Sequence, residues 1–264
     1  MPPQNPKIQA IYRYPVKGLA AQTLQCVRLS PASTLPADRL YAVENGPSGF
    51  DPDTAAYLPK QRFLMLMRNE RLAALRTDFD DATHVLTVRA DDGQAARGDL
   101  RTEQGRTAIE TFFAAYCADE LRGPPRVLAG QDGHSFSNMK PPHSFSDVAQ
   151  KVVSIINLAS VAAVENAVGA PVDPLRFRGN LYVSGWPPWR EFDLLGKEIA
   201  VGPARLKVVR RIKRCAATNV EPDTGLRDMN IPQTLMQAFG HADCGIYTEV
   251  VSGGEIAVGD PVAA

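Results

Sequence analysis

The chain has 264 residues, of which 44% are apolar, so it can bury the core of one large domain or of two modest ones. Its 29 Lys and Arg residues balance its 29 Asp and Glu residues. This balance argues against a general nucleic-acid binder, which depends on excess positive charge, but it is compatible with a local basic pocket.

The amino-terminal residues are polar and proline-rich and lack the apolar stretch of a secretory leader. The most apolar region, residues 152–164, is interrupted by polar side chains and is too short to span a bilayer. We therefore expect a cytoplasmic protein without a membrane span. The cysteines show no pairing pattern and are expected to be free thiols: Cys26, Cys117, Cys215 and Cys244.

In the first half, alternation of apolar and polar residues between turn signals predicts short strands at residues 8–14, 23–29, 39–44, 72–77 and 84–89. A helix is predicted at residues 107–117, with Thr107 as its cap and Glu110 at the capping-box position. A Gly-Pro-Pro run then interrupts the pattern. It places the predicted domain boundary between residues 1–123 and residues 124–264.

The second half predicts more strands, at residues 126–128, 152–156, 180–184, 198–201 and 205–212. Helices are predicted at 160–168 and 233–239, and the run Ser252-Gly253-Gly254 predicts a hairpin between residues 245–251 and 255–258. Many short strands with few helices indicate a mainly β protein with peripheral helices, of the α+β class, with a barrel in the second half.

Residues 205–225 differ from the rest of the chain, because a predicted strand carrying Arg210, Arg211, Lys213 and Arg214 leads directly into Cys215. Positive neighbours favour the thiolate form of a cysteine, and thiolates suit thiophilic metals. One cysteine cannot hold an aquated metal firmly, so such a site needs a cofactor that brings its own ligands. A dithiolene-bearing pterin does this, and its phosphate would explain the surrounding cations.

A structural interpretation of Cys215 stays open, because a lone cysteine near basic residues is usually buried or incidental. His241 and Cys244 resemble half a zinc site, but the sequence offers no second pair at suitable spacing. Trp186 and Trp189 are interpreted as packing anchors. The sequence has no hydrolase elbow, P-loop or dinucleotide fingerprint.

Residues 214–225 resemble the signature of the MOSC domain, Arg-Cys-x-x-Thr-x-Val-x-Pro-x-Thr-Gly, which is the C-terminal domain type of molybdenum cofactor sulfurases. Residues 176–180 resemble the Phe-Arg-Pro-Asn element of that domain, and residues 259–262 resemble its ending. Residues 14–18, 38–39 and 61–62 resemble the MOSC N-terminal β-barrel domain. By architecture, the chain resembles the amidoxime-reducing components and their bacterial counterparts.

The resemblance implies a β-barrel MOSC domain preceded by a smaller β-rich domain, with molybdenum-molybdopterin as the cofactor. It implies that Cys215 is the metal ligand and that Lys17, Arg39 and Arg178 contact the phosphate or the pterin. The implied pocket also includes Asn180, Arg214 and Thr218, and a further cofactor-contacting loop with Ser146 and Asp147.

Two positions depart from the family pattern. Gly18 stands where the family often has Ser, so a hydroxyl is lost, although the Gly18 backbone N–H can still serve a phosphate oxygen. Gly179 stands where the family has Pro, which is expected to loosen that turn.

The implied activity is that of a molybdoenzyme, with Cys215 as the catalytic ligand, which reduces N-hydroxylated small molecules. The sequence contains neither a pyridoxal-phosphate domain nor a four-cysteine ferredoxin segment, so we expect electrons from a separate ferredoxin or flavoprotein/haem-type donor. Two alternatives stay open: a carrier or insertion factor for the cofactor, and a sulfur-transfer module with a persulfide on Cys215.

Overall fold

The structure is a computed structural model that describes residues 5–51, 58–130 and 145–263. Its main element is a curled eight-stranded sheet in the order β15-β11-β12-β13-β9-β10-β1-β2. The neighbouring strands are antiparallel, except that β9 and β10 are parallel. The strands of this sheet are β1 (Lys7–Arg13), β2 (Gln22–Leu24), β9 (Val153–Asn157), β10 (Leu181–Ser184), β11 (Glu198–Val201), β12 (Ala204–Lys213), β13 (Asp243–Ser252) and β15 (Val262–Ala263).

Smaller sheets complete the β structure. Strands β5 (Arg76–Asp80), β6 (Val85–Arg89) and β7 (Ala95–Asp99) form an antiparallel sheet. Two further pairs join β4 (Tyr41–Val43) to β8 (Val127–Ala129) and β3 (Cys26–Leu29) to β14 (Gly254–Ala257). Together these sheets confirm the predicted mainly β class.

In the described part of the chain, three α-helices lie at the periphery: α1 (Glu103–Tyr116), α2 (Leu158–Val168) and α3 (Ile231–Phe239). Helices α2 and α3 each end at a glycine with left-handed backbone, as predicted. Short 3-10 helices are η1 (Lys60–Arg62), η2 (Glu70–Ala74), η3 (Ala118–Glu120), η4 (Pro174–Phe177), η5 (Arg190–Leu194) and η6 (Ala216–Asn219). None of the described helices is long and apolar enough to cross a membrane.

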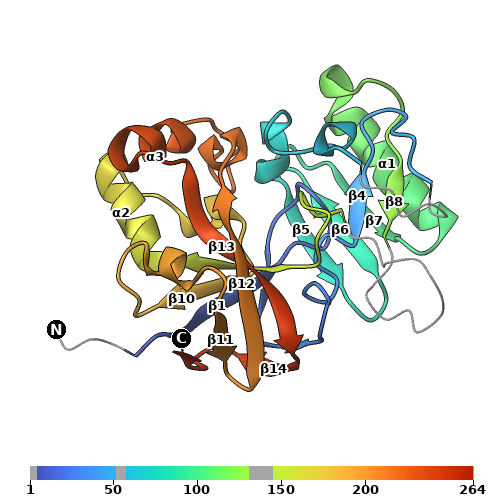
Figure 1. Cartoon of the computed structure of the whole chain (residues 1–264). Helices are drawn as coiled ribbons and strands as arrows, with labels where there is room; N and C mark the ends of the chain where they lie inside the picture. The colour runs from blue at the N-terminus through green and yellow to red at the C-terminus, as the bar shows by residue number, and fades with distance from the viewer. Residues whose placement is uncertain (1–4, 52–57, 131–144, 264) are drawn as a thin grey trace.

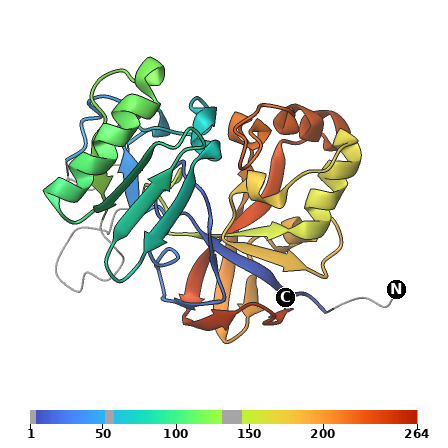
Figure 2. The same cartoon turned by 180° about the vertical axis from the view of Figure 1, so that it is seen from behind.

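The elements form two lobes (Figure 1). The N-terminal lobe consists of β4 to β8 with α1, which buries one face over an apolar core that includes Phe79, Leu86 and Phe113. The C-terminal lobe consists of the eight-stranded sheet with β3, β14, α2 and α3. Seen from behind, β1 runs beside the strands of the C-terminal lobe although it lies near the start of the chain (Figure 2).

The chain therefore crosses between the lobes more than once. Strands β1 to β3 pair with strands of the second half, whereas β8 returns to pair with β4. The division at residue 123 stays a prediction about the sequence. Residues 131–144 of the predicted polar loop lie outside the described residues.

Three predicted strands need correction, and one strand was missed. Residues 255–258 do not form a hairpin with the preceding strand: β13 pairs with β12 and, at residues 246–248, with β9, whereas β14 pairs with β3. The predicted strand at 72–77 is η2 followed by β5. The predicted strand at 23–29 divides into β2 and β3, which belong to different sheets. Strand β7 was absent from the predicted elements.

Helix α1 begins earlier than predicted. Its cap is Thr102, whose hydroxyl accepts a hydrogen bond from the Gly105 amide at 3.0 Å, and Thr107 lies inside the helix. Both threonines suit a cap by composition. Thr102 is selected because Gly105 and Gly98 pack backbone against backbone, where a Cβ on Gly98 would lie 2.1 Å from the Gly105 oxygen.

Candidate functional site

A cavity of about 320 Å³ is lined by residues from both lobes. The chain has no net charge, yet among the described lining residues nine are basic and two are acidic. The basic residues are Lys17, Arg39, Lys60, Arg176, Arg178, Arg210, Arg211, Lys213 and Arg214; the acidic residues are Asp38 and Asp147. The cavity is therefore suited to an anionic ligand.

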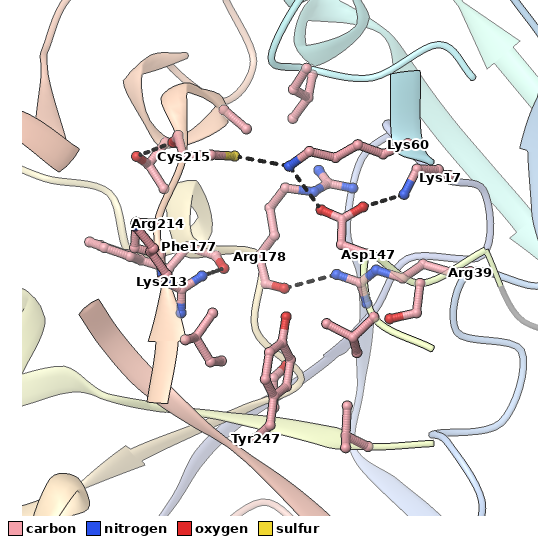
Figure 3. A pocket seen from close by; sticks show the side chains of 18 of the residues that line it. Lys17, Arg39, Lys60, Asp147, Phe177, Arg178, Lys213, Arg214, Cys215 and Tyr247 are labelled. Carbon is pink, nitrogen blue, oxygen red and sulfur yellow. Dashed lines mark hydrogen bonds and ion pairs between the residues drawn. The ribbon is translucent and has the colours of Figure 1, made fainter. Parts of the chain in front are cut away.

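The structure brings all ten predicted cofactor-contact residues onto this lining: Lys17, Gly18, Arg39, Ser146, Asp147, Arg178, Asn180, Arg214, Cys215 and Thr218. Figure 3 shows two sides. Lys17, Arg39, Lys60 and Asp147 make up one, here called the acid-paired side. The other, here called the thiol side, is formed by the end of β12 with Lys213, Arg214 and Cys215.

Cys215 follows β12 and precedes η6. Its carbonyl oxygen accepts hydrogen bonds from the Thr218 amide at 3.0 Å and from the Thr218 hydroxyl at 2.9 Å. Thr218 therefore fixes the backbone that carries the thiol. Across the cavity, the Lys60 ammonium lies 3.4 Å from the Cys215 sulfur (Figure 3).

The other cysteines are in different environments. Cys117 and Cys244 are buried, and burial raises the pKa of each thiol to about 12. Cys26 is exposed on β3. Among the described residues, Cys215 is thus the one cysteine on the cavity lining.

Asp147 joins the two lysines of the acid-paired side. Its carboxylate bonds to the Lys17 ammonium and lies 3.7 Å from the Lys60 ammonium. Burial disfavours the charged carboxylate, but Lys17 and Lys60 outweigh this effect and hold the pKa of Asp147 well below its usual range. Burial lowers the pKa of Lys17, although the nearby Asp147 carboxylate acts to raise it. The Lys17 ammonium also donates a hydrogen bond to the Phe145 oxygen at 2.9 Å.

Tyr14 holds two guanidinium groups beside the cavity. The guanidinium of Arg39 lies 4.7 Å from the centre of its ring and that of Arg178 lies 4.2 Å from it. Arg39 also bonds to Asp38 and donates to the Arg178 oxygen at 3.0 Å. Both arginines have left-handed backbone, with φ of 53° and 49°, which is uncommon for residues other than glycine. In the sequence, Tyr14 stood out only as part of the motif at residues 14–18. Its role in holding the two arginines depends on the tertiary arrangement.

Arg214 and Asn180 use their polar atoms on the protein itself. The Arg214 guanidinium donates to the Cys244 and Phe177 oxygens, each at 2.7 Å. The Asn180 side chain accepts from Ser154 and donates to the Tyr12 oxygen at 3.2 Å. These contacts hold neighbouring strands and η4 in position around the cavity. Direct contact of Arg214 and Asn180 with a cofactor stays a prediction.

Arg176 anchors the loop that follows Cys215. Its buried guanidinium pairs with Asp228 at 2.7 Å and with Glu221. The Arg227 side chain extends from the same loop to the Ala216 oxygen at 3.0 Å and to the Met67 oxygen at 2.8 Å in the N-terminal lobe. The signature loop therefore fastens one lobe to the other next to the thiol.

The two departures from the family pattern have structural reasons. Gly18 has φ of +85°, and a Cβ there would lie 3.1 Å from the Leu64 oxygen, so this backbone favours glycine. A Cβ on Gly179 would lie 2.3 Å from Cγ1 of Ile156, and the Gly179 amide donates to the Tyr182 hydroxyl at 3.1 Å. The expected loosening at Gly179 is therefore wrong, because the turn is tightly packed against Ile156.

Other sequence-based interpretations have mixed outcomes. Trp186 is buried in the core, and Trp189 packs against Phe239, as expected for packing anchors. No group of three or more His, Cys, Asp and Glu residues that could hold a metal ion occurs in the parts of the chain that the structure describes. Lys60, Tyr247 and Met65 line the cavity without having been singled out. The one indication of Lys60 in the sequence was its position next to Gln61 and Arg62, which belong to the family motif.

Comparisons with known proteins agree with these observations. A family model for the MOSC domain matches residues 132–263, and one for the MOSC N-terminal beta barrel domain matches residues 5–120. The chain is 28% identical to human mitochondrial amidoxime-reducing component 1 over 97% of this chain and 82% of that protein. Rat mitochondrial amidoxime reducing component 2 is 29% identical over 62% of this chain and 53% of that protein.

Among solved structures, the YUAD protein from Bacillus subtilis is similar at 12% identity with a TM-score of 0.44, covering 98% of this chain and 94% of that one. The two family models meet in the same chain and together span nearly all of it. The chain thus belongs to the MOSC domain family and carries the MOSC N-terminal beta barrel domain before the MOSC domain.

Proposed function

We propose that this protein is a molybdenum cofactor-dependent oxidoreductase that reduces N-hydroxylated small molecules with electrons from a separate donor protein. The observation that carries the proposal is a single cavity thiol, Cys215, at the edge of a strongly basic cavity. The similarity to amidoxime-reducing components supports this reaction class. The net reaction takes up two electrons and two protons, breaks the N–O bond, and releases the amine-type product and water.

The residues of the cavity fit molybdenum-molybdopterin. The cofactor brings a dithiolene to the metal, so one protein thiolate is a sufficient anchor, and the Cys215 sulfur is available on the lining. Lys17, Arg39 and Arg178 would face the anionic pterin phosphate, and the Gly18 amide and Ser146 would add neutral donors. When bound, the cofactor supplies a metal that accepts and returns two electrons.

The chain's own residues prepare this site. Thr218 orients the backbone of Cys215, and Lys60 places positive charge beside its sulfur. Asp147 keeps Lys17 and Lys60 together on the acid-paired side. These contacts hold the Cys215 backbone and the cations in place before any ligand binds, which reduces the cost of organising the site.

The test is to express the chain in a host that makes the cofactor and to compare wild type, Cys215→Ala and Cys26→Ala. Metal analysis and turnover of benzamidoxime with a chemical reductant are the readouts. We expect Cys215→Ala to lose both bound molybdenum and at least about 1,000-fold in turnover, while Cys26→Ala, an exposed cysteine on β3, keeps both.

Full turnover by Cys215→Ala would refute the proposal. A wild-type protein that is replete with molybdenum but has no turnover would instead indicate a carrier or insertion factor. A transferable extra sulfur on Cys215, detected by mass in a molybdenum-free protein, would indicate sulfur transfer.

A further inference from the structure

We propose that Arg210, Arg211 and Lys213 form a second anion-binding site at the outer part of the cavity, and that this site binds a carboxylate or similar anionic group on the substrate. The inference rests on the proposed function and gives it a substrate class, namely N-hydroxylated compounds that carry a negative charge. It follows from which cations of the cavity have partners and which form no ion pair.

The inner cations already have carboxylate or backbone-oxygen partners. Lys17 bonds to Asp147, Arg39 bonds to Asp38, and Arg176 pairs with Asp228. Arg178 donates to the Leu19 oxygen at 2.8 Å, and the Arg214 guanidinium is held by backbone oxygens. A pterin phosphate placed among the predicted contacts would add further negative charge to this inner set.

The outer cations have no such compensation. Arg210, Arg211 and Lys213 are exposed, line the cavity, and form no ion pair with any residue in the described ranges 5–51, 58–130 and 145–263. The Arg210 guanidinium lies 5.1 Å from the ring centre of Tyr247, and that of Arg211 lies 4.2 Å from the ring centre of Phe192. Ring faces orient a guanidinium without neutralising its charge.

The backbone of β12 brings these side chains together. In a regular strand, successive side chains point to opposite faces, so neighbours such as Arg210 and Arg211 would not line one cavity. The pairing of β12 with β13 shifts register between Val208 and Arg210, and again between Arg211 and Lys213. Such irregularities redirect side chains, and they are frequent beside active sites. The pairing also shifts register between Arg205 and Leu206, but these residues lie outside the cavity.

Three uncompensated cations beside a reaction site for small molecules therefore select substrates by charge. One carboxylate near two or three cations gains attraction that a neutral substrate of the same shape does not gain. The effect should weaken as salt rises, because the cations are exposed to solvent.

The experiment compares two substrates, benzamidoxime and 4-carboxybenzamidoxime, with a chemical reductant and without a donor protein. The variants are Arg210→Gln/Lys213→Gln and the control Lys207→Gln, an exposed lysine on the same strand outside the cavity. We expect the double variant to lose about 10- to 100-fold in kcat/KM for the carboxylate substrate and less than about 2-fold for the neutral one. The control should change neither.

A second readout does not depend on turnover. Calorimetry of the purified protein with the products 4-carboxybenzamidine and benzamidine should show tighter binding of the carboxylate, and this advantage should disappear in the double variant. Absence of turnover by wild type with both substrates would contradict the proposed function, and the calorimetry would still decide the anion site.

Three results would overturn the proposal. Equal losses for both substrates would show that the cations do not discriminate by charge. Loss of molybdenum and pterin from the double variant would assign the cations to the cofactor, including a phosphate of a nucleotide form. A loss seen only when a donor protein delivers the electrons would assign the cations to docking of that protein.

Discussion

The cations on the two sides of the cavity have different partners. On the acid-paired side, Lys17 and Lys60 contact Asp147, and Arg39 contacts Asp38. On the thiol side, no carboxylate is among the described lining residues, and the cations are matched by backbone oxygens, by ring faces or by solvent. The number of cations therefore does not show where an anion binds; their partners do.

This difference assigns separate tasks to the two sides. Paired cations are fixed in place and can be buried, because the carboxylate offsets the cost of removing them from water. Unpaired cations at the opening keep their charge available to an incoming ligand. The thiol lies where the two sides meet, within reach of Lys60.

The largest effect is expected from a substitution that disrupts the acid-paired side. Lys17→Met removes the buried cation that bonds to Asp147 and to the Phe145 oxygen. It removes a predicted phosphate contact and weakens the compensation of Asp147, so we expect about 100-fold weaker retention of the cofactor. Pterin and molybdenum content after dialysis measure this loss. Arg13→Met, which removes another buried cation that bonds to Asp81 away from the cavity, is the control, and an equal loss there would contradict the prediction.

A smaller effect is expected from the Tyr14 ring beside the cavity. Tyr14→Leu removes the face on which the Arg39 and Arg178 guanidinium groups rest, and we expect about 10-fold weaker cofactor retention. Tyr14→Phe keeps the face and should retain the cofactor like wild type. If Phe and Leu at this position behave alike, the ring is not what orders the two arginines.

Removal of the contact between Lys60 and Cys215, which joins the two sides, is expected to have a still smaller effect. Lys60→Met removes the ammonium at 3.4 Å from the Cys215 sulfur but leaves the thiol and the inner cations. Molybdenum should be retained, while the potential of the bound metal shifts to more negative values, because a cation and a hydrogen-bond donor to the sulfur are lost. Redox titration followed by electron paramagnetic resonance measures the shift. Lys60→Arg should restore most of it, and an unchanged potential in Lys60→Met would exclude this role.

The smallest effect compares two buried carboxyl groups, one in each lobe. Burial opposes the charge of Glu44, but Arg126 and Ser48 outweigh it and lower the pKa of Glu44. Burial raises the pKa of Glu191, whose carboxyl accepts from the neutral groups of Asn157 and Ser160. The stabilising contribution of Glu44 is therefore present above its unfolded-state pKa and is lost as the pH falls through its folded-state pKa. That of Glu191 is present at low pH and is lost as the pH rises through its folded-state pKa.

Thermal or denaturant unfolding from pH 2 to pH 8 tests this contrast. Relative to wild type, Glu191→Gln should gain stability as the pH rises, and Glu44→Gln should lose it, each by on the order of 1 kcal/mol. If the stability of the two variants changed with pH in the same way, the two buried carboxyl groups would not differ as predicted.

Several features followed from local chemistry alone. The apolar run that became β9, the glycine ends of α2 and α3, and the cationic strand leading into Cys215 all depend on near neighbours in sequence. Helix caps, alternation and turns are local properties, so residue order is enough to indicate them. The resemblance added the distant residues of the cavity, which spacing could not connect.

Other features were decided only by tertiary contacts. Residue order made 245–258 look like a hairpin, but β13 pairs with the distant strands β12 and β9, and β14 pairs with β3. Lys60 contacts a sulfur 155 residues away. Tyr14 lies beneath arginines from both halves of the chain. The sequence alone determined which chemical groups were available and where most of the strands lie, because those depend on composition and local pattern. The tertiary structure decided which cations were neutralised and which faced the cavity unpaired, because charge compensation depends on distance in space.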